Sequence, residues 1–258
     1  MTKNKHIGKN FSLLFLVLIT FLKGYSQQKP SLGKIYDRYG KQYTLNDITI
    51  NTPDGSLNRS PQLTCSSTSY FNLFFETGSG MENTSNPVHN ARRLVICKVF
   101  EDLSNFIISP LTATGKKVNI LVKNFNNTSA PAGVLGMASS YYIAPYNPGI
   151  FAGGILDGEM WKTIHLGNDS YTNMGNLGNF YHGEVAFNFT DSNILWHTDL
   201  TINAPGNLYD LYTVMLHEIT HALGFNSFID QNGASITGMG YYTRYDTFLR
   251  SNTNQPLL

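Results

Sequence analysis

Residues 217–225 read His-Glu-Ile-Thr-His-Ala-Leu-Gly-Phe, and this stretch decides what is expected of the rest of the chain. His217 and His221 are four residues apart, so on a helix of about 3.6 residues per turn both imidazoles project from one face. Two imidazoles one turn apart form a rigid half of a tetrahedral zinc site. Glu218 adjoins the first histidine and can take a proton from a water molecule without being a ligand. The stretch therefore predicts a Zn²⁺ site with a general base beside it.

The residues around this stretch predict a helix over 207–223. Asn207 is a favourable helix cap with Asp210 at the third helical position, and Gly224 can adopt the left-handed conformation that ends a helix. The turns before the first histidine carry the apolar residues of a buried face: Leu211, Val214, Met215 and Leu216. The histidine pair is thus expected on a helix that packs into the protein.

The upstream sequence predicts a sheet with a helix behind it. An apolar helix begins at Asn86-Pro87, where Asn can cap and Pro suits the first helical position. Strands are expected where apolar and polar residues alternate. The predicted elements are a helix over 86–108, strands over 117–125, 133–143 and 183–190, and a short strand over 160–165. Because strands and helices do not alternate regularly, the pattern favours an α+β fold over a doubly wound one.

The N-terminus has the pattern of a secretory signal peptide over residues 1–26. Three lysines precede an apolar run of about 12 residues over 11–22, and small residues follow at Gly24 and Ser26. The run is shorter than the roughly 20 residues that span a bilayer, so we expect cleavage and no membrane span in the mature protein. Residues 27–62 are expected to be an irregular lead-in or a propeptide, and residues 63–258 the main domain. The protein is expected outside the cytoplasm, secreted or periplasmic.

The composition is that of an ordinary globular protein, with 41% hydrophobic residues, 14% charged residues and a formal net charge of +1. This balance provides no basic surface for nucleic acid, so no nucleic-acid partner is expected. The two cysteines, Cys65 and Cys97, can form a disulfide in an oxidising compartment or remain as buried thiols.

Residues 217–225 resemble the active-site helix of metzincin-type zinc endopeptidases, which belong to the zincins. The ending His-Ala-Leu-Gly-Phe is most similar to the leishmanolysin group. Residues 208–225, together with Tyr-Thr-Arg-Tyr-Asp-Thr-Phe-Leu at 242–249, also resemble related secreted bacterial metallopeptidase-like proteins. The resemblance implies a zincin-like fold, with a twisted mixed sheet backed by the helix at 86–108. The active-site helix would lie below an edge strand that binds substrate, and by position 183–190 would be that strand.

The sequence departs from the family pattern at the third zinc ligand. In the commonest metzincin pattern a third His follows the conserved Gly by three positions, but that position is Ser227. After His221 the chain has no further His or Glu. We therefore expect a domain truncated at its C-terminal end, with the third ligand beyond it; the alternative is that Asp246 is the ligand, although its segment reads equally well as structural.

Other residues near the motif have structural interpretations. His165, His182 and His197 precede the helix and are expected to be surface or hydrogen-bonded histidines. Met239 is expected to lie in a loop, although it is reminiscent of the methionine turn of metzincins. Three tyrosines can stabilise an oxyanion or simply pack, and packing is the expected role: Tyr241, Tyr242 and Tyr245.

The sequence thus predicts a secreted endopeptidase that hydrolyses protein or peptide substrates, with His217 and His221 as zinc ligands and Glu218 as general base. The alternative is a secreted binding or adhesion protein that keeps a zincin scaffold without turnover.

Overall fold

The computed structural model describes residues 33–50, 65, 70–125, 133–144, 153–171 and 180–258. These residues form a mixed α+β fold, as the sequence predicts, and residues 32–258 form one compact unit. The predicted signal peptide lies outside the described residues. The strands are β1 (Lys34–Tyr36), β2 (Gln42–Tyr43), β3 (Phe71–Phe75), β4 (Val118–Asn124), β5 (Gly136–Ser140), β6 (Tyr142–Ala144), β7 (Gly154–Leu156), β8 (Gly183–Phe187), β9 (Trp196–His197), β10 (Tyr209–Asp210) and β11 (Tyr241–Thr243). The helices are α2 (Leu45–Ile48), α3 (Pro87–Phe106), α4 (Leu111–Thr114), α5 (Glu159–Leu166), α6 (Leu211–Ala222) and the 3₁₀ helix η2 (Tyr245–Phe248).

The main sheet has four strands in the order β3-β4-β8-β5. The first three run parallel, and β5 pairs antiparallel with β8, with Ala138 opposite Val185. The sheet is therefore mixed. The prediction that residues 183–190 form the edge strand is wrong, because β8 lies between β4 and β5 and all five of its residues are buried. The antiparallel edge strand is β5.

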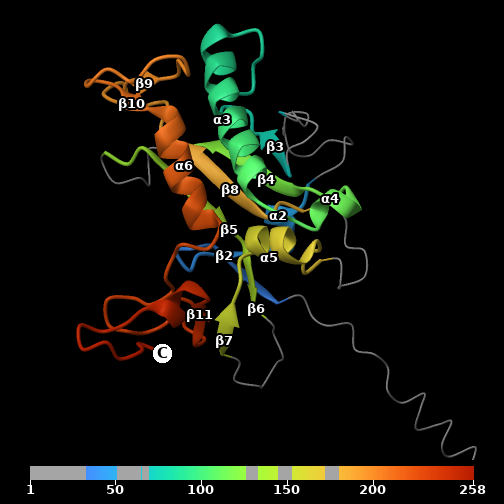
Figure 1. The fold of residues 1–258 in the computed structure, drawn as a ribbon, viewed down its shortest axis with the longest axis vertical. Coiled ribbons are helices and arrows are strands. Elements are labelled where there is room, and N and C mark those ends of the chain that lie inside the picture. The colour runs from blue at the N-terminus through green and yellow to red at the C-terminus, as the bar shows by residue number, and fades with distance from the viewer. Residues whose placement is uncertain (1–32, 51–64, 66–69, 126–132, 145–152, 172–179) are drawn as a thin grey trace, which may run out of the picture. The chain divides into compact units, whose positions relative to one another are not determined.

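Helices α3 and α6 cover the same face of this sheet (Figure 1). As predicted, α3 is capped by Asn86, whose side chain accepts the backbone N–H groups of Val88 and His89, with Pro87 in the first turn. Its buried stripe packs with the strands into one apolar core. The α3 residues in that core are Val95, Ile96, Val99 and Phe100.

Helix α6 begins later than the sequence predicts. Its cap is Asp210, whose carboxylate accepts the backbone N–H of Thr213 at 2.9 Å, whereas Asn207 lies outside the helix. The reason is that Tyr209 and Asp210 pair with β9 as strand β10, and extended residues cannot also be helical. At the other end the helix stops at Ala222. Gly224 has a φ of 116°, a backbone conformation that residues with a side chain rarely adopt.

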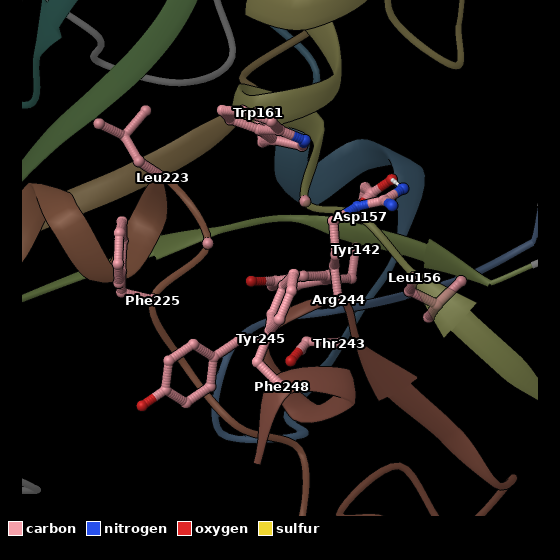
Figure 2. Close-up of a pocket in the computed structure, with 12 residues that line it drawn as sticks. Tyr142, Leu156, Asp157, Trp161, Leu223, Phe225, Thr243, Arg244, Tyr245 and Phe248 are labelled. Atoms are coloured by element: carbon pink, nitrogen blue, oxygen red, sulfur yellow. Dashed lines mark hydrogen bonds and ion pairs between the residues drawn. The ribbon is translucent and has the colours of Figure 1, made fainter. Parts of the chain in front are cut away.

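Residues 160–165 lie in helix α5, so the short strand predicted there is wrong. The backbone N–H of Met160 in the first turn donates to Ser140 Oγ at 3.0 Å, and Gly167 ends the helix in the left-handed conformation. The Ser140 contact comes from β5, which is distant in sequence. Trp161 projects from α5 toward a pocket that also contains Phe225 and Tyr245 (Figure 2).

The described part of the predicted irregular lead-in, residues 33–50, is regular structure. Strand β1 is the middle strand of a second sheet, with β2 on one side and β6 on the other. Ile35 and Tyr36 are only 2% and 3% exposed, and they belong to two different apolar clusters. Tertiary pairing with β6 makes a strand of a segment whose own pattern is weak.

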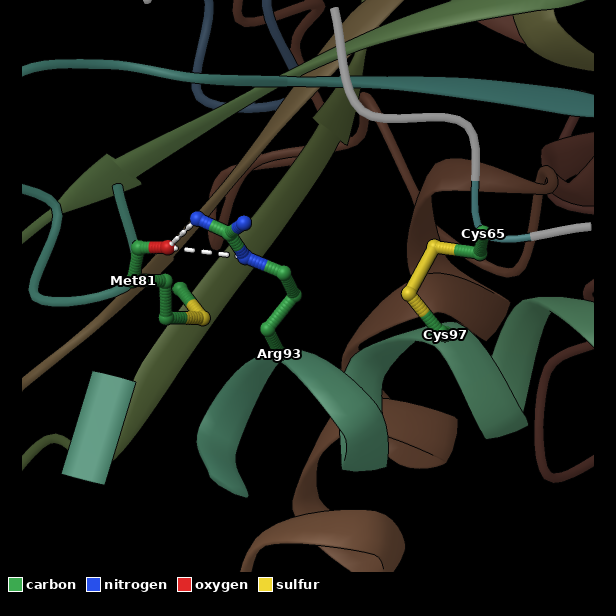
Figure 3. Close-up of a disulfide and its surroundings, with 4 residues drawn as sticks. All are labelled: Cys65, Met81, Arg93 and Cys97. Atoms are coloured by element: carbon green, nitrogen blue, oxygen red, sulfur yellow. Dashed lines mark hydrogen bonds between the residues drawn. A yellow bond between two sulfur atoms is a disulfide. The ribbon is translucent and has the colours of Figure 1, made fainter. Parts of the chain in front are cut away.

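A disulfide and a buried arginine secure the α3 side of the sheet (Figure 3). Cys65 and Cys97 form a disulfide, which decides between the two states that the sequence left open. Arg93 is buried on α3 and donates through Nε, at 2.9 Å, and through Nη2 to the carbonyl of Met81. Its guanidinium also lies 4.8 Å from the ring centroid of Phe75. These contacts join α3 to the segments before and after β3.

Within the described part of the chain, no helix has both the length and the apolar character that crossing a bilayer requires.

The disulfide is expected to contribute to stability by restricting the unfolded chain. It closes a loop with a sequence separation of 32, for which chain entropy predicts about 3.7 kcal/mol. Chemical denaturation of the Cys65→Ser, Cys97→Ser double variant should show that loss in the free energy of unfolding. A reductant should lower the stability of the parent chain and leave the double variant unchanged; equal stabilities of the two chains would contradict the prediction.

Candidate functional site

Helix α6 presents its histidines on the side away from the core. Its buried residues are Leu211, Met215, Ile219 and Ala222, which pack against one face of the main sheet. Between them, His217 is exposed and His221 half-buried, so both imidazoles are reachable from solvent. The apolar face therefore fixes the rotation of the helix, and that rotation aims the histidine pair outward.

The two histidines converge on one point. Nε2 of His217 and Nε2 of His221 are 3.3 Å apart. Two ligand nitrogens of a tetrahedral zinc ion, with Zn–N bonds of about 2.0–2.1 Å, lie about 3.3–3.4 Å from each other. The separation in the chain thus equals the separation that a shared zinc ion requires.

The other nitrogen of His221 is fixed by the backbone. Nδ1 lies 2.7 Å from the carbonyl oxygen of Phe225, which can only accept a hydrogen bond, so Nδ1 carries the proton. Nε2 then carries the lone pair and faces Nε2 of His217, from which it can accept a hydrogen bond. Metal-binding histidines commonly have this arrangement, because the second hydrogen bond sets the tautomer and the ring orientation.

Glu218 lies beside the pair in a partly dry setting. Its side chain is 12% exposed, and Oε2 has no hydrogen-bond partner among the described residues. The nearest cation is Arg38, whose Nη1 is 3.7 Å from Oε2. The carboxylate is therefore charge-paired but retains hydrogen-bonding capacity on Oε2 for a further group.

The described residues do not bring a third ligand to the pair. Among them, no group of three or more His, Cys, Asp or Glu side chains is arranged to hold a metal ion. Asp246 is fully buried, and its Oδ2 accepts the backbone N–H groups of Phe228 at 3.0 Å and Thr243 at 2.7 Å. These contacts give Asp246 the structural role that the sequence allowed. The histidine pair fits zinc as two of its ligands.

The remaining residues singled out in the sequence have other contacts. His182 Nδ1 accepts the backbone N–H of Asn119, and its Nε2 lies 3.1 Å from Asp169. His165 stacks on Trp161, Ser227 Oγ accepts the N–H of Ile229, and Met239 Sδ accepts the hydroxyl of Tyr36. For His197 the expectation of a surface or hydrogen-bonded histidine is wrong, because it is buried, its Nδ1 lies 3.6 Å from Asp210 Oδ1, and neither ring nitrogen has a hydrogen-bond partner among the described residues.

A pocket of about 250 Å³ opens next to the end of α6 (Figure 2). Its wall includes Leu223, Gly224 and Phe225, which begin two positions after His221. Five aromatic side chains line the same hollow: Tyr142, Trp161, Phe225, Tyr245 and Phe248. The pocket is thus mostly apolar, and part of its wall is the segment that follows His221.

Polar contacts hold the pocket wall. Arg244 forms a bidentate ion pair with Asp157, at 2.8 and 2.6 Å, across two chain segments. Burial raises the pKa of the Tyr142 phenol well above its ordinary value, so it stays protonated and donates to Asn226 Oδ1 at 2.6 Å. Both contacts link the β6–β7 region to the chain after α6.

Sequence reasoning missed the residues that the fold brings in from a distance. Arg38 lies 180 positions before Glu218, in a turn with no motif, and Trp161 lies in a segment for which the sequence predicts a strand. A local clue existed for the turn, since Asp37 and Gly40 are typical turn residues. Nothing in the spacing could connect either residue to α6.

Comparisons of this chain with protein-family models, with curated proteins and with solved structures return no match.

The histidine pair is expected to bind zinc. In a titration of the purified chain against a chromophoric chelator, His217→Ala and His221→Ala should each weaken zinc affinity by more than about tenfold, because each removes one of two converging ligands. His165→Ala is the matched control, since that exposed histidine stacks on Trp161 and should leave the affinity unchanged. Equal affinities in all four chains would exclude this pair as the site.

Proposed function

We propose that this protein is a secreted zinc-dependent endopeptidase of zincin type, which hydrolyses peptide bonds in proteins or peptides. The observation that carries the proposal is the 3.3 Å separation of the Nε2 atoms of His217 and His221, with Glu218 next to His217 in the sequence of the same helix. Two ligands and a base on one helix are the parts that metal-assisted hydrolysis needs at its centre. Secretion rests on the sequence pattern of residues 1–26.

Glu218 is the general base in this proposal. Its carboxylate accepts a proton from the attacking water and returns it to the leaving amine, so no covalent enzyme intermediate forms. A zinc ion held by His217 and His221 would act as a Lewis acid on the scissile carbonyl and acidify water. Partial burial of Glu218 suits the role, because few water molecules then compete for the carboxylate.

Strand β5 is the proposed binding edge for an extended substrate. It lies at one end of the strand order of the main sheet, and α6 packs against it. A chain paired along β5 would therefore lie near the histidine pair. Main-chain hydrogen bonds to a strand edge bind peptides with little dependence on sequence, and of the β5 residues Met137 alone is not buried. The antiparallel direction of β5 relative to β8 distinguishes it from the other strands.

The aromatic pocket is the proposed site for one large apolar side chain of the substrate. Its walls contain Trp161, Phe225 and Tyr245. It lies near His221, because the segment just after this histidine forms part of its wall. Burying an apolar side chain there provides binding energy of about 25 cal/mol per Å² of apolar surface. The pocket would thus add side-chain selectivity to the backbone pairing along β5.

A second function keeps the scaffold but not the turnover. It is favoured by one observation, that among the residues described no third metal ligand joins the pair. In that case the chain would be a secreted binding or adhesion protein, and the edge of β5 and the aromatic pocket would hold a peptide without cleaving it.

Removal of the proposed base tests turnover directly. With zinc added, Glu218→Gln and Glu218→Ala should lower casein cleavage by about 10²- to 10⁴-fold, because the proton acceptor is lost. Zinc affinity should be retained, since Glu218 is not a ligand. Glu101→Gln, an exposed substitution on α3, is the control. Equal cleavage rates of Glu218→Gln and the parent chain, or no cleavage by the parent, would exclude the peptidase function.

The pocket predicts selectivity for bulky apolar residues. Peptides with Phe or Leu beside the scissile bond should be cleaved about tenfold or more faster than their Ala counterparts. Trp161→Ala should reduce that ratio by removing one wall, as measured by kcat/KM on the paired peptides. Phe106→Ala removes an exposed ring at the end of α3 and should leave the ratio unchanged; the same ratio in the Trp161→Ala variant would contradict the assignment.

A further inference from the structure

The turn that joins β1 to β2, residues 37–41, is rigid and is called the N-terminal turn. The buried Asp37 carboxylate accepts the backbone N–H groups of Tyr39 at 2.8 Å and Lys41 at 2.9 Å. The backbone closes the same loop, because Asp37 N–H donates to the carbonyl of Lys41 at 3.0 Å. Gly40 has a φ of 78°, a backbone conformation that residues with a side chain rarely adopt. The conformation of the turn is thus set by its own residues.

This turn lies between β5 and the segment after α6. On one side the backbone N–H of Arg38 donates to Ser139 Oγ of β5 at 2.8 Å. On the other side the backbone of Gly40 approaches Ile236 so closely that a Cβ at Gly40 would lie 2.7 Å from the Ile236 carbonyl oxygen. The N-terminal turn therefore occupies a defined place beside the proposed binding edge.

The strand before the turn anchors it to the rest of the fold. Strand β1 is paired on both sides, and Tyr36 reaches the core of the C-terminal segment, where its hydroxyl donates to Met239 Sδ at 3.2 Å. Its neighbour Ile35 packs into a separate cluster with Tyr141 and Tyr181. The segment is thus held to the fold through two apolar cores.

The turn directs Arg38 at the proposed base. Arg38 Nη1 and Glu218 Oε2 are 3.7 Å apart, and their side chains are 15% and 12% exposed. This distance is too long for a hydrogen bond, and among the described residues neither atom has a hydrogen-bond partner. Nη2 of the same guanidinium is held by the hydroxyl of Tyr39 at 2.6 Å. The charge is therefore fixed in place while the facing nitrogen and oxygen keep free hydrogen-bonding capacity.

We propose that Arg38 is a positioning residue for Glu218: the N-terminal turn holds a guanidinium against the carboxylate and so sets its place beside the histidine pair. The inference rests on the proposed function. In a partly dry site an opposite charge attracts a carboxylate more strongly than in water, and this attraction limits the rotamers of Glu218. Because the two atoms do not hydrogen bond, Oε2 stays available to a water molecule or a substrate group.

The first test is a double-mutant cycle on the metal-free chain. Arg38→Gln and Glu218→Gln are made singly and together, and the equilibrium constant of unfolding is measured by chemical denaturation. We expect a coupling of about threefold or more, because charges in contact are not independent. Lys41→Gln is the matched control; it makes the same charge change in the same turn on an exposed side chain, and it should not couple to Glu218. Absence of coupling between Arg38 and Glu218 overturns the proposal.

The second test measures peptide cleavage with zinc added. Arg38→Gln should lower kcat by about 10- to 100-fold, as expected for a misplaced base, with KM changed less than about twofold. Arg38→Lys should recover part of kcat, since it keeps the charge without the planar guanidinium. A rise in activity on loss of Arg38 would mean that the turn inhibits the site, and an unchanged kcat would mean that the contact is only structural; either result overturns the proposal.

The two tests separate the inference from the proposed function. If the parent chain does not cleave peptides, the proposed function fails, and the coupling measured without metal still decides whether Arg38 holds Glu218. If the parent chain cleaves peptides and the coupling is absent, the proposed function stands and the positioning role fails.

Discussion

The packing of α6 under the main sheet is the contact on which the site depends. Leu211, Met215, Ile219 and Ala222 are all buried there, so the helix has one available rotation. That rotation leaves His217 and His221 on the outer side, with their Nε2 atoms 3.3 Å apart. Apolar burial, which has no chemical role in the site, therefore provides the precision that metal coordination needs.

Backbone groups then refine what the helix presents. The chain turns at Gly224 and brings the carbonyl of Phe225 to His221 Nδ1, which selects the tautomer. The same turn places Leu223 and Phe225 in the wall of the aromatic pocket. The short segment after the helix thus has two roles, because it orients His221 and also forms part of the pocket wall.

The N-terminal segment completes the surroundings of the helix from the opposite end of the chain. Its strand β1 pairs with β6, and its turn brings Arg38 to Glu218. The same residues would be exposed and unpaired without the rest of the fold. The site is therefore built from segments 180 positions apart, and its charge balance depends on tertiary pairing rather than on the motif.

Local periodicity and capping are enough to predict the α+β class, helix α3 from its Asn86-Pro87 cap, strand β4, and the spacing of His217, Glu218 and His221 on one helix. These follow from contacts within a few residues along the chain. Long-range packing is needed to specify that β5 and not β8 lies at the sheet edge, that residues 160–165 are helical, that Cys65 and Cys97 are joined, and that Arg38 faces Glu218. Each of these depends on partners distant in sequence, and no local pattern specifies which partner a strand edge, a thiol or a charge will meet.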